Sequence, residues 1–386
     1  MFWLVLVTIS GAWIRHIWAF PGESIVDAKH LTHAHSHIAL LGWCWGIVVA
    51  YLLRKVLAPK RGLWFWRLFA VVFHVSVGGM FITFAQAGYW KWSIIFSAVH
   101  VTLGTLFVVL YFVKRRKLES RTSLLAFDAA LLLALIANVA PMMLSFGSMQ
   151  TTSAVTIAVN SYVHLQCFGF LVLFLMGMLY DAVITDNHLH SNRLVYLITF
   201  ASIPSQLVAV AHLIDGELDL IIGSLGMAAY AVGLFLVLYQ VYQNWDRVKL
   251  AGCQSMLRAV MTGGFVLASA LLIASVPMVS DAFREARFLV IGIIHLLLLG
   301  MVTPVFLYYS HRRSGMNEHD VKPGVIVLML SIWVMLLILI FAGLGQGLGV
   351  LLPFHVPKAL FYSAIPISLA AIYLFMTALR RSFRME

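Results

Sequence analysis

Long apolar stretches, separated by short polar segments, follow one another along the whole chain. A helix needs about 20 mostly apolar residues to cross the hydrocarbon core of a bilayer. Because no polar segment is long enough to fold on its own, the pattern predicts an all-α integral membrane protein with a single transmembrane domain over residues 1–386. The twelve predicted spans are residues 2–19, 33–53, 63–85, 92–113, 123–146, 153–182, 194–213, 219–243, 257–279, 286–309, 325–345 and 358–379.

Basic residues gather on one side of these spans. All but six of the 26 Lys and Arg residues lie in or beside the segments that follow even-numbered spans. The six on the other side are Arg15, Lys29, Lys91, Arg284, Arg287 and Lys358. Since cytoplasmic loops carry an excess of Lys and Arg, this asymmetry places both termini in the cytoplasm. It predicts a multi-pass protein of a bacterial-type inner membrane.

Composition narrows the classes of function. Apolar residues make up 62% of the chain and charged residues 11%, against about 25% charged residues in soluble domains. This excludes a soluble, disordered, coiled-coil or nucleic-acid-binding protein and leaves the lipid bilayer as the surrounding partner. Cys44, Cys167 and Cys253 form no CxxC or CxxCH motif, which excludes a disulfide framework, a zinc ribbon and covalently attached haem.

A short motif recurs on every fourth predicted span. It consists of His, three residues, a large apolar residue and Gly, and it occurs at residues 37–42, 164–169 and 295–300. The recurrence predicts three four-helix arcs with pseudo-threefold symmetry, built from repeats at approximately 1–122, 123–250 and 251–386. Glycine lets a neighbouring helix or a flat cofactor come close to the backbone. Leu and Gly are common in this chain, so chance is the alternative.

Histidines gather in the outer half of the predicted membrane region. The three motif histidines lie roughly four to eleven residues from the outer span ends, which is about 6–16 Å. His100 and His212 fall in the same half. Polar side chains within a bilayer are costly and usually functional, and imidazoles from several helices suit a metal or a haem iron. A lone histidine is more often an interhelical hydrogen bonder, but five together favour a metal or haem centre.

The second predicted span opens with four histidines, His30, His33, His35 and His37. On a helix, residues 30, 33 and 37 form one stripe, and residue 35 points away from it. Only His37 matches the repeated motif, with His33 as the alternative ligand. The outer-face cations Arg284 and Arg287 suit either haem propionates or the membrane interface.

These features together resemble the catalytic subunits of the haem-copper oxidase superfamily, which are oxygen and nitric oxide reductases. Members have twelve helices in three four-helix arcs, with haem and copper ligands on helices 2, 6, 7 and 10. The resemblance covers nearly the whole chain in topology but only short motifs in sequence. It implies that His37, or His33, and His295 are the two axial ligands of a low-spin haem b. It also implies metal-binding and catalytic roles for His164 and His212, at a site for copper or a second haem.

The chain departs from the family at three positions. Ile293 replaces the usual axial ligand of a high-spin haem, and Ala211 replaces one copper histidine. Phe168 stands where some members carry Tyr or Glu. His100 and His74 are the available substitutes for the missing axial ligand, so the resemblance leaves the second metal site degenerate.

The function implied is that of a haem b-binding membrane redox protein, an oxidoreductase that transfers electrons. Nitric oxide or oxygen would be reduced at the second metal site. Since the chain has no cytochrome c domain, quinol or another redox protein would donate the electrons. The NnrS family of twelve-helix haem- and copper-containing membrane proteins, linked to nitric oxide stress, is the second resemblance. A secondary transporter with a histidine proton relay and an intramembrane zinc hydrolase are the alternatives from other classes.

Overall fold

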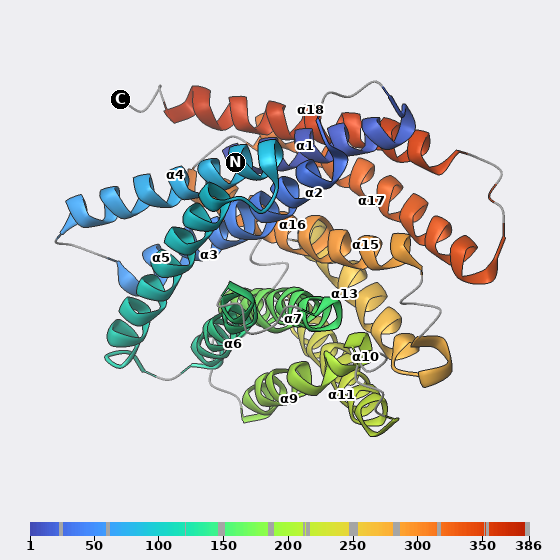
Figure 1. The fold of residues 1–386 in the computed structure, drawn as a ribbon. Coiled ribbons are helices and arrows are strands. Elements are labelled where there is room, and N and C mark those ends of the chain that lie inside the picture. Colours follow the sequence, from blue (N-terminus) through green and yellow to red (C-terminus); the bar gives the residue numbers. More distant parts are fainter. Residues whose placement is uncertain are drawn as a thin grey trace. The chain divides into compact units, whose positions relative to one another are not determined.

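The computed structural model describes residues 1–22, 26–58, 62–119, 121–145, 151–183, 189–210, 213, 217–246, 254–280, 286–314, 318–350, 352 and 355–382. Within these ranges every regular element is a helix (Figure 1). Twelve helices there are long and apolar enough to cross a membrane. The chain therefore has the architecture of an all-α, multi-pass membrane protein, as the sequence predicts.

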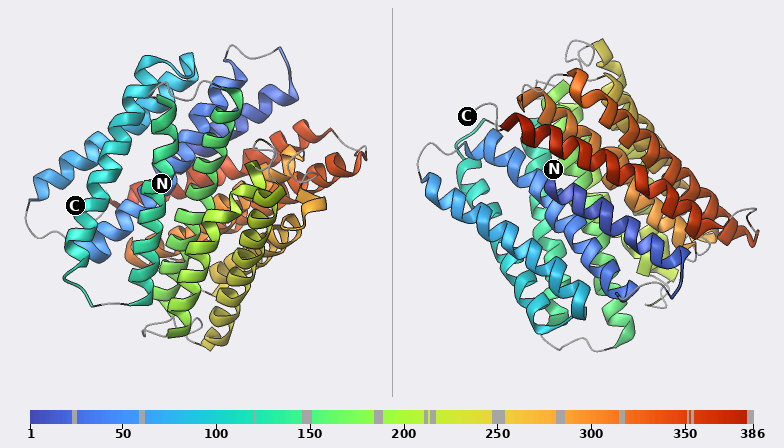
Figure 2. Two further views of the ribbon diagram at one scale, coloured as in Figure 1. Left: turned by 60° about the horizontal axis from the view of Figure 1, so that its bottom comes forward. Right: turned by 90° about the horizontal axis from the view of Figure 1, so that it is seen from above.

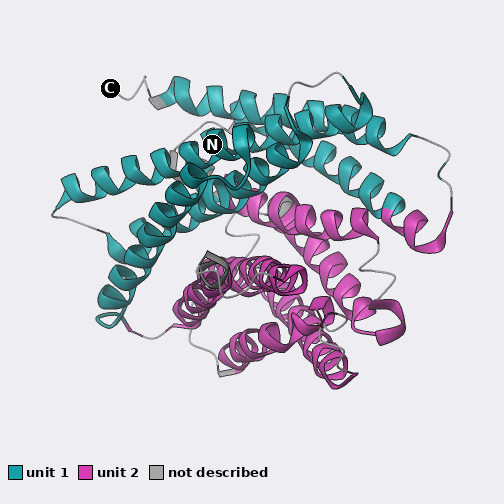
Figure 3. Ribbon diagram, in the orientation of Figure 1, with its two compact units in different colours: residues 1–118, 309–342, 351–386 teal, residues 119–308, 343–350 magenta. Residues whose placement is uncertain are grey.

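The chain divides into two compact units (Figure 3). Unit 1 consists of residues 1–118, 309–342 and 351–386. It contains α1 (Phe2–Ala19), α2 (Ala28–His37), η1 (Ile38–Cys44), α3 (Trp45–Leu52), η2 (Leu53–Leu57), α4 (Leu63–Ala87), α5 (Lys91–Arg115), most of α17 (Glu318–Leu348) and α18 (Val356–Ser382).

Unit 2 consists of residues 119–308 and 343–350. It contains α6 (Thr122–Ser145), α7 (Thr152–His164), η3 (Leu165–Leu171), α8 (Val172–Val183), α9 (Leu189–Ser205), α10 (Leu207–Val210), α11 (Glu217–Gln243), α13 (Gln254–Ala274), α15 (Arg287–His295), η5 (Leu296–Val302) and the first part of α16 (Thr303–Ser314). The elements labelled η are π-helices.

Within unit 1, α1 packs lengthwise against α18, which places the first and last spans side by side (Figure 2). The continuous span formed by α2, η1, α3 and η2 packs against α1 and α4, and α4 forms a hairpin with α5. Trp3 of α1 and Val77 of α4 are buried where these helices meet.

Within unit 2, α6 packs against α8 and η3, and α11 packs against α9 and α13. The rings of Phe127 on α6 and Phe174 on α8 are 5.2 Å apart and fully buried. In a bilayer, close packing of this kind stabilises the unit through van der Waals contacts between helices.

The outer faces of the spans are also apolar. On α4 and α5, Val71, Val75, Ile95, Val109 and Val113 are exposed. A soluble protein rarely exposes such contiguous apolar surface, whereas a bilayer covers it. Contact with membrane lipid therefore follows from the distribution of side chains as well as from the span count.

Each of the twelve predicted spans corresponds to an observed helix, with boundaries shifted by a few residues. The second span begins earlier than predicted, because its helix begins at Ala28. Asp27 caps this helix, because its carboxylate Oδ1 accepts hydrogen bonds from the backbone N–H of Lys29 (2.7 Å) and His30 (2.9 Å). Such a cap satisfies amides that have no partner in the helix, so the histidine-rich segment is helical throughout.

Candidate functional site

The three motif histidines occupy the same position in the secondary structure. His37, His164 and His295 are the last residues of α2, α7 and α15. In each case a seven-residue π-helix begins at the next residue. The motif glycine, Gly42, Gly169 or Gly300, is the fifth residue of that π-helix in all three.

This agreement is informative because π-helices are rare, usually form short interruptions of α-helices and often mark functional sites. Three of them in one register relative to a histidine are not explained by the apolar composition alone. The sequence repeat is therefore also a repeat of local backbone structure. A π-helix holds an extra residue in its turn, so it shifts the side chains that follow relative to those before the histidine.

His37 has a fixed ring orientation. Its Nδ1 lies 2.8 Å from the carbonyl oxygen of His33, one helical turn earlier. A carbonyl only accepts, so Nδ1 carries the proton, and a neutral ring then has its lone pair on Nε2. The ring also stacks on Phe84 of α4, with ring centres 4.1 Å apart.

His295 repeats this arrangement in unit 2. Its Nδ1 lies 2.8 Å from the carbonyl oxygen of Ile291, again four residues earlier. The side chain is half-buried, as is that of His37. A backbone carbonyl on the second ring nitrogen is the usual way in which proteins orient a histidine ligand. Arg287, which was predicted at the outer end of this span, is exposed in the first turn of α15.

The histidine stripe on α2 is confirmed. His33 contacts the ring of Tyr89 edge-on, with ring centres 5.0 Å apart. His30 lies against the backbone of Gly88, where an added Cβ would come within 2.8 Å of its ring. His30, His33 and His37 thus all face the end of α4 and the turn after it.

His35 points elsewhere, as its helical position predicts. Its Nδ1 lies 3.0 Å from Ser10 Oγ on α1. The ring also approaches Gly11, where an added Cβ would come within 3.0 Å of it. His35 therefore contributes to the packing of α2 on α1.

His100 lies on α5 in the same unit as His37, and it is buried. Its Nδ1 is 3.1 Å from Ser76 Oγ. That hydroxyl donates its own proton to the carbonyl oxygen of Phe73 at 2.8 Å, so His100 Nδ1–H is the donor to Ser76.

His164 is engaged through its other nitrogen. Its Nε2 lies 2.9 Å from Ser205 Oγ at the end of α9. Ser205 donates its proton to the carbonyl oxygen of Ser202 at 3.0 Å, so Nε2–H of His164 is the donor to Ser205. Nε2 of His164 therefore carries a proton in this arrangement, in contrast to His37.

Two of the π-helices have a carbonyl oxygen that accepts a hydrogen bond from a hydroxyl group. The buried Tyr230 of α11 donates its hydroxyl proton to the carbonyl oxygen of Phe168 in η3. Thr303, the residue that follows η5, donates to the carbonyl oxygen of Leu298 at 2.8 Å. These contacts satisfy backbone groups inside an apolar interior, where an unpaired carbonyl is costly.

The predicted second metal site extends beyond the described part of the chain. His212 and Arg284 both lie outside the described residues, so their predicted roles stay predictions. Among the residues that are described, no group of three or more His, Cys, Asp or Glu side chains is arranged to hold a metal ion. Cys44 and Cys167 are buried and are not joined in a disulfide.

The sequence reasoning missed the partners that fix the histidine rings. Ser76 and Ser205 lie 24 and 41 residues from their histidines, and serine is common in transmembrane helices. Tyr230 could have been identified from the sequence as a hydrogen-bonding residue, because a tyrosine in the middle of an apolar span needs a partner for its hydroxyl. Asp27 could have been identified as a helix cap, since Asp directly before a helix is a common N-cap.

Comparison with known proteins adds no family assignment: no protein-family model and no curated protein matches the chain.

Proposed function

We propose that the chain is a haem b-binding membrane redox protein of the haem-copper oxidase type, with His37 and His295 as the axial ligands. The observation that supports this is the shared local structure of these two histidines. Each ends an α-helix, directly precedes a seven-residue π-helix, and has Nδ1 fixed on the carbonyl oxygen four residues earlier.

The donor chemistry fits the group. A haem iron needs neutral imidazole nitrogens, and a backbone carbonyl on Nδ1 holds the proton away from Nε2. The intermediate burial of both rings limits the access of water without closing them off. An iron with two imidazole ligands transfers single electrons and has no open position for a gas. Here the chain's own contribution is to orient the two rings.

Reduction of nitric oxide or oxygen is the finer part of the proposal and needs a second centre. We assign this centre to His164 and His212, with copper or a second haem as the metal, and quinol or a redox protein as the electron donor. Metal binding at His164 requires that Nε2 leave Ser205, or that Nδ1 be the ligand, because Nε2–H donates to Ser205 Oγ. The gas chemistry therefore ranks behind haem binding and electron transfer.

The proposal includes a topology. The repeated His–π-helix unit supports three four-helix arcs, and the distribution of Lys and Arg supports a cytoplasmic location of both termini in a bacterial-type inner membrane. This orientation places all three motif histidines in the outer half of the bilayer.

The test of haem binding is an optical spectrum of the full chain purified in detergent, oxidised and reduced, with a bis-pyridine assay for haem content. We expect reduced-state bands of a low-spin haem b. His37→Ala and His295→Ala should each lose most of the haem, and added imidazole should restore part of it. A wild-type chain that lacks haem after expression with sufficient haem supply contradicts the proposal.

Matched variants separate a ligand from a merely buried histidine. His35→Ala removes an imidazole from the same helix as His37, but from the side that faces Ser10 of α1, and should leave the haem content unchanged. His100→Ala removes the buried histidine of α5, in the same unit as His37. If His100→Ala abolishes the bands and His295→Ala does not, the axial pair is assigned wrongly.

Gas reduction has its own assay, the anaerobic consumption of nitric oxide or the consumption of oxygen with a reduced quinol analogue. We expect His164→Ala to abolish the consumption and to leave the low-spin haem bands in place. A haem-loaded wild type with no consumption restricts the function to electron transfer.

A further inference from the structure

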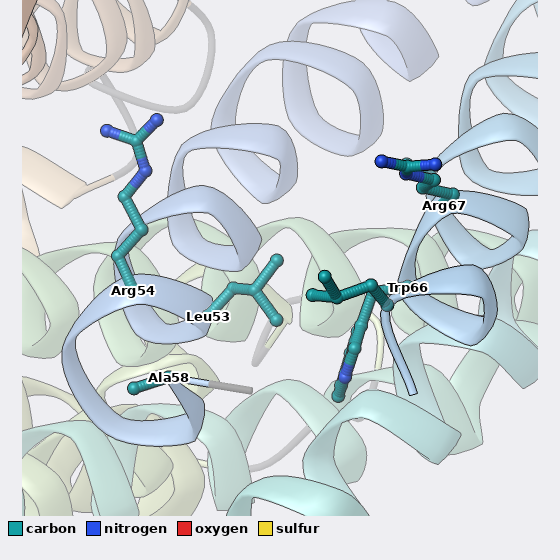
Figure 4. Close-up of a pocket in the computed structure, with 7 residues that line it drawn as sticks. Leu53, Arg54, Ala58, Trp66 and Arg67 are labelled. Atoms are coloured by element: carbon teal, nitrogen blue, oxygen red, sulfur yellow. The ribbon is translucent and has the colours of Figure 1, made fainter. Parts of the chain in front are cut away.

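A cavity of about 600 Å³ opens in unit 1 between the end of η2 and the beginning of α4 (Figure 4). Its volume lies within the usual range of small-molecule sites, about 300–1,000 Å³. One wall consists of Leu63, Trp66, Arg67 and Ala70. These residues follow the i, i+3, i+4, i+7 spacing, so they share one face of α4.

The opposite wall comes from the preceding span. Leu53 and Arg54 begin η2, and Ala58 follows its last residue. In Figure 4 the two guanidinium groups stand on opposite sides of the pocket, with Leu53 and Trp66 between them. The cavity therefore combines two cations with an apolar floor.

The charge of the cavity is not balanced by its lining. Arg54 and Arg67 are both exposed, and none of the described residues that line the cavity carries a carboxylate. Among the described residues, neither arginine has an ion pair or a side-chain hydrogen bond. Arginine matches phosphate oxygens with two parallel N–H donors. Each of these two arginines can therefore bind phosphate oxygens.

The position of the cavity along the helices indicates where that phosphate comes from. Arg54 lies in the last turns of one span, and Arg67 lies in the second turn of the next. Arginines and tryptophans at span ends lie at the level of the lipid headgroups. Basic pockets between transmembrane helices at that level bind anionic headgroups.

We propose that this cavity is a binding site for an anionic phospholipid. The phosphate lies between Arg54 and Arg67, and an acyl chain runs along Leu53, Leu63 and Ala70. The absence of a carboxylate among the described lining residues disfavours a choline headgroup, because its ammonium would be a third cation without a counterion. This site is independent of the proposed haem ligands.

The first experiment is native mass spectrometry of the delipidated full chain, titrated with phosphatidylglycerol or phosphatidylcholine. We expect phosphatidylglycerol to bind more tightly. Arg54→Gln/Arg67→Gln should weaken its binding by about tenfold or more, since each basic residue near a headgroup contributes on the order of 1 kcal/mol. Arg116→Gln/Lys117→Gln is the control, because it removes two exposed charges after α5, outside the cavity.

A second variant retains both arginines and places a bulky side chain in the apolar part of the cavity. Ala70→Trp should weaken the binding of phosphatidylglycerol by several fold, because the bulky ring occupies the acyl-chain position while Arg54 and Arg67 remain. Inorganic phosphate at equal concentration should compete poorly, since it gains no apolar contact. Ala70 is exposed, so this variant also tests the site if the double arginine variant does not fold.

Three results overturn the proposal. Equal binding of both lipids excludes a site for anionic lipid. An equal loss in the control and in Arg54→Gln/Arg67→Gln reduces the effect to net charge. Full displacement by inorganic phosphate, with no effect of Ala70→Trp, identifies an anion site without a lipid tail.

Discussion

At the scale of single residues, one motif position has two kinds of histidine. His37 and His295 use Nδ1 toward a carbonyl of their own helix, whereas His164 uses Nε2 toward Ser205 of another helix. The position in the motif therefore does not determine which ring nitrogen carries the proton. The hydrogen-bond acceptor near each ring determines it. This is why the proposal gives His37 and His295 precedence over His164.

Replacing Ser205 by alanine should destabilise unit 2. The Nε2–H group of His164 would lose its acceptor in a buried position, which costs about 1–3 kcal/mol. Denaturant or thermal unfolding in detergent measures this change. Ser36→Ala is the control, because Ser36 is exposed and its hydroxyl bonds only to Thr32 of its own helix. Equal effects of both variants would show that the contact with His164 contributes nothing.

Tyr230→Phe should also lower stability, since it leaves the carbonyl oxygen of Phe168 without the hydroxyl inside the membrane region. We expect a loss of about 1–3 kcal/mol. Tyr196→Phe is the matched control, because Tyr196 is 50% exposed on α9 of the same unit. Unchanged unfolding of Tyr230→Phe would mean that this carbonyl finds another donor.

At the scale of elements, the motif glycines are needed where the π-helices meet their neighbours. A Cβ on Gly42 would lie 2.7 Å from Val77 Cγ1, and one on Gly169 would lie 3.0 Å from Leu133 Cδ1. The motif glycines were predicted to admit either a neighbouring helix or a flat cofactor, and at Gly42 and Gly169 a side chain of a neighbouring helix comes close to the backbone.

Gly42→Ala should therefore cost about 1–3 kcal/mol of stability through overpacking. Gly46→Ala, one turn later in the same continuous span, is the control. Its new Cβ would meet only Phe73 Cε1 at 3.9 Å, and alanine is the better helix former by about 1 kcal/mol. The melting temperatures of the two variants should shift in opposite directions. Shifts in the same direction would contradict the packing argument.

The N-terminus of α2 should respond to acid. The backbone N–H of His30, followed by that of Lys29, donates to the Asp27 carboxylate and holds the pKa of Asp27 below its ordinary value of 3.8. A lowered pKa means that this stabilisation is complete above the ordinary value and is lost as the pH falls through the lower, folded-state pKa.

We expect the wild type to be more stable than Asp27→Asn at neutral pH and to lose this advantage in acid. Asparagine caps a helix without carrying the charge, so the difference between the two proteins isolates the contribution of the carboxylate charge to stability. Melting followed by circular dichroism between neutral pH and pH values below 3.8 measures the difference. A difference that is constant over this range would exclude the carboxylate as its source.

Hydropathy was enough to find the elements but not their internal geometry. The twelve spans follow from apolar stretches whose length matches the bilayer, and the faces of α2 follow from the helical period. The π-helices after His37, His164 and His295 were not predictable, because no residue type distinguishes them from the surrounding α-helix. Residues 38–44 and 296–302 are apolar residues around a single Gly, and such a sequence suits either form.

At the scale of the whole molecule, the long-range partners were the hardest to predict. The contact of His164 with Ser205 and that of Trp3 Nε1 with His74 Nδ1, at 2.9 Å, join different helices. A single sequence marks the polar residue but not its partner. The grouping of spans into two units was also not predicted, and the three-repeat arrangement stays a prediction.

The predicted topology can be tested with reporters fused after α5, after α18 and in the segment between α4 and α5. A fluorescent protein that folds in the cytoplasm should be bright after Arg116 and after α18. Alkaline phosphatase, which requires an oxidising compartment, should be active when inserted at Tyr89. The reverse pattern would invert the membrane orientation and place the motif histidines in the inner half.

The division of the chain into units has a consequence for biosynthesis. Residues 119–308 of unit 2 form one uninterrupted stretch, whereas unit 1 joins residues 1–118 to segments that follow residue 308. During translation, α18, which packs against α1, leaves the ribosome only after residues 119–308 of unit 2. The N-terminal spans are therefore inserted in the membrane before α18 is made. Until then, the side of α1 that packs against α18 has no protein partner, while most of unit 2 assembles. A chain truncated before residue 356 would lack α18, so this side of α1 would stay uncovered and accessible to quality-control proteases.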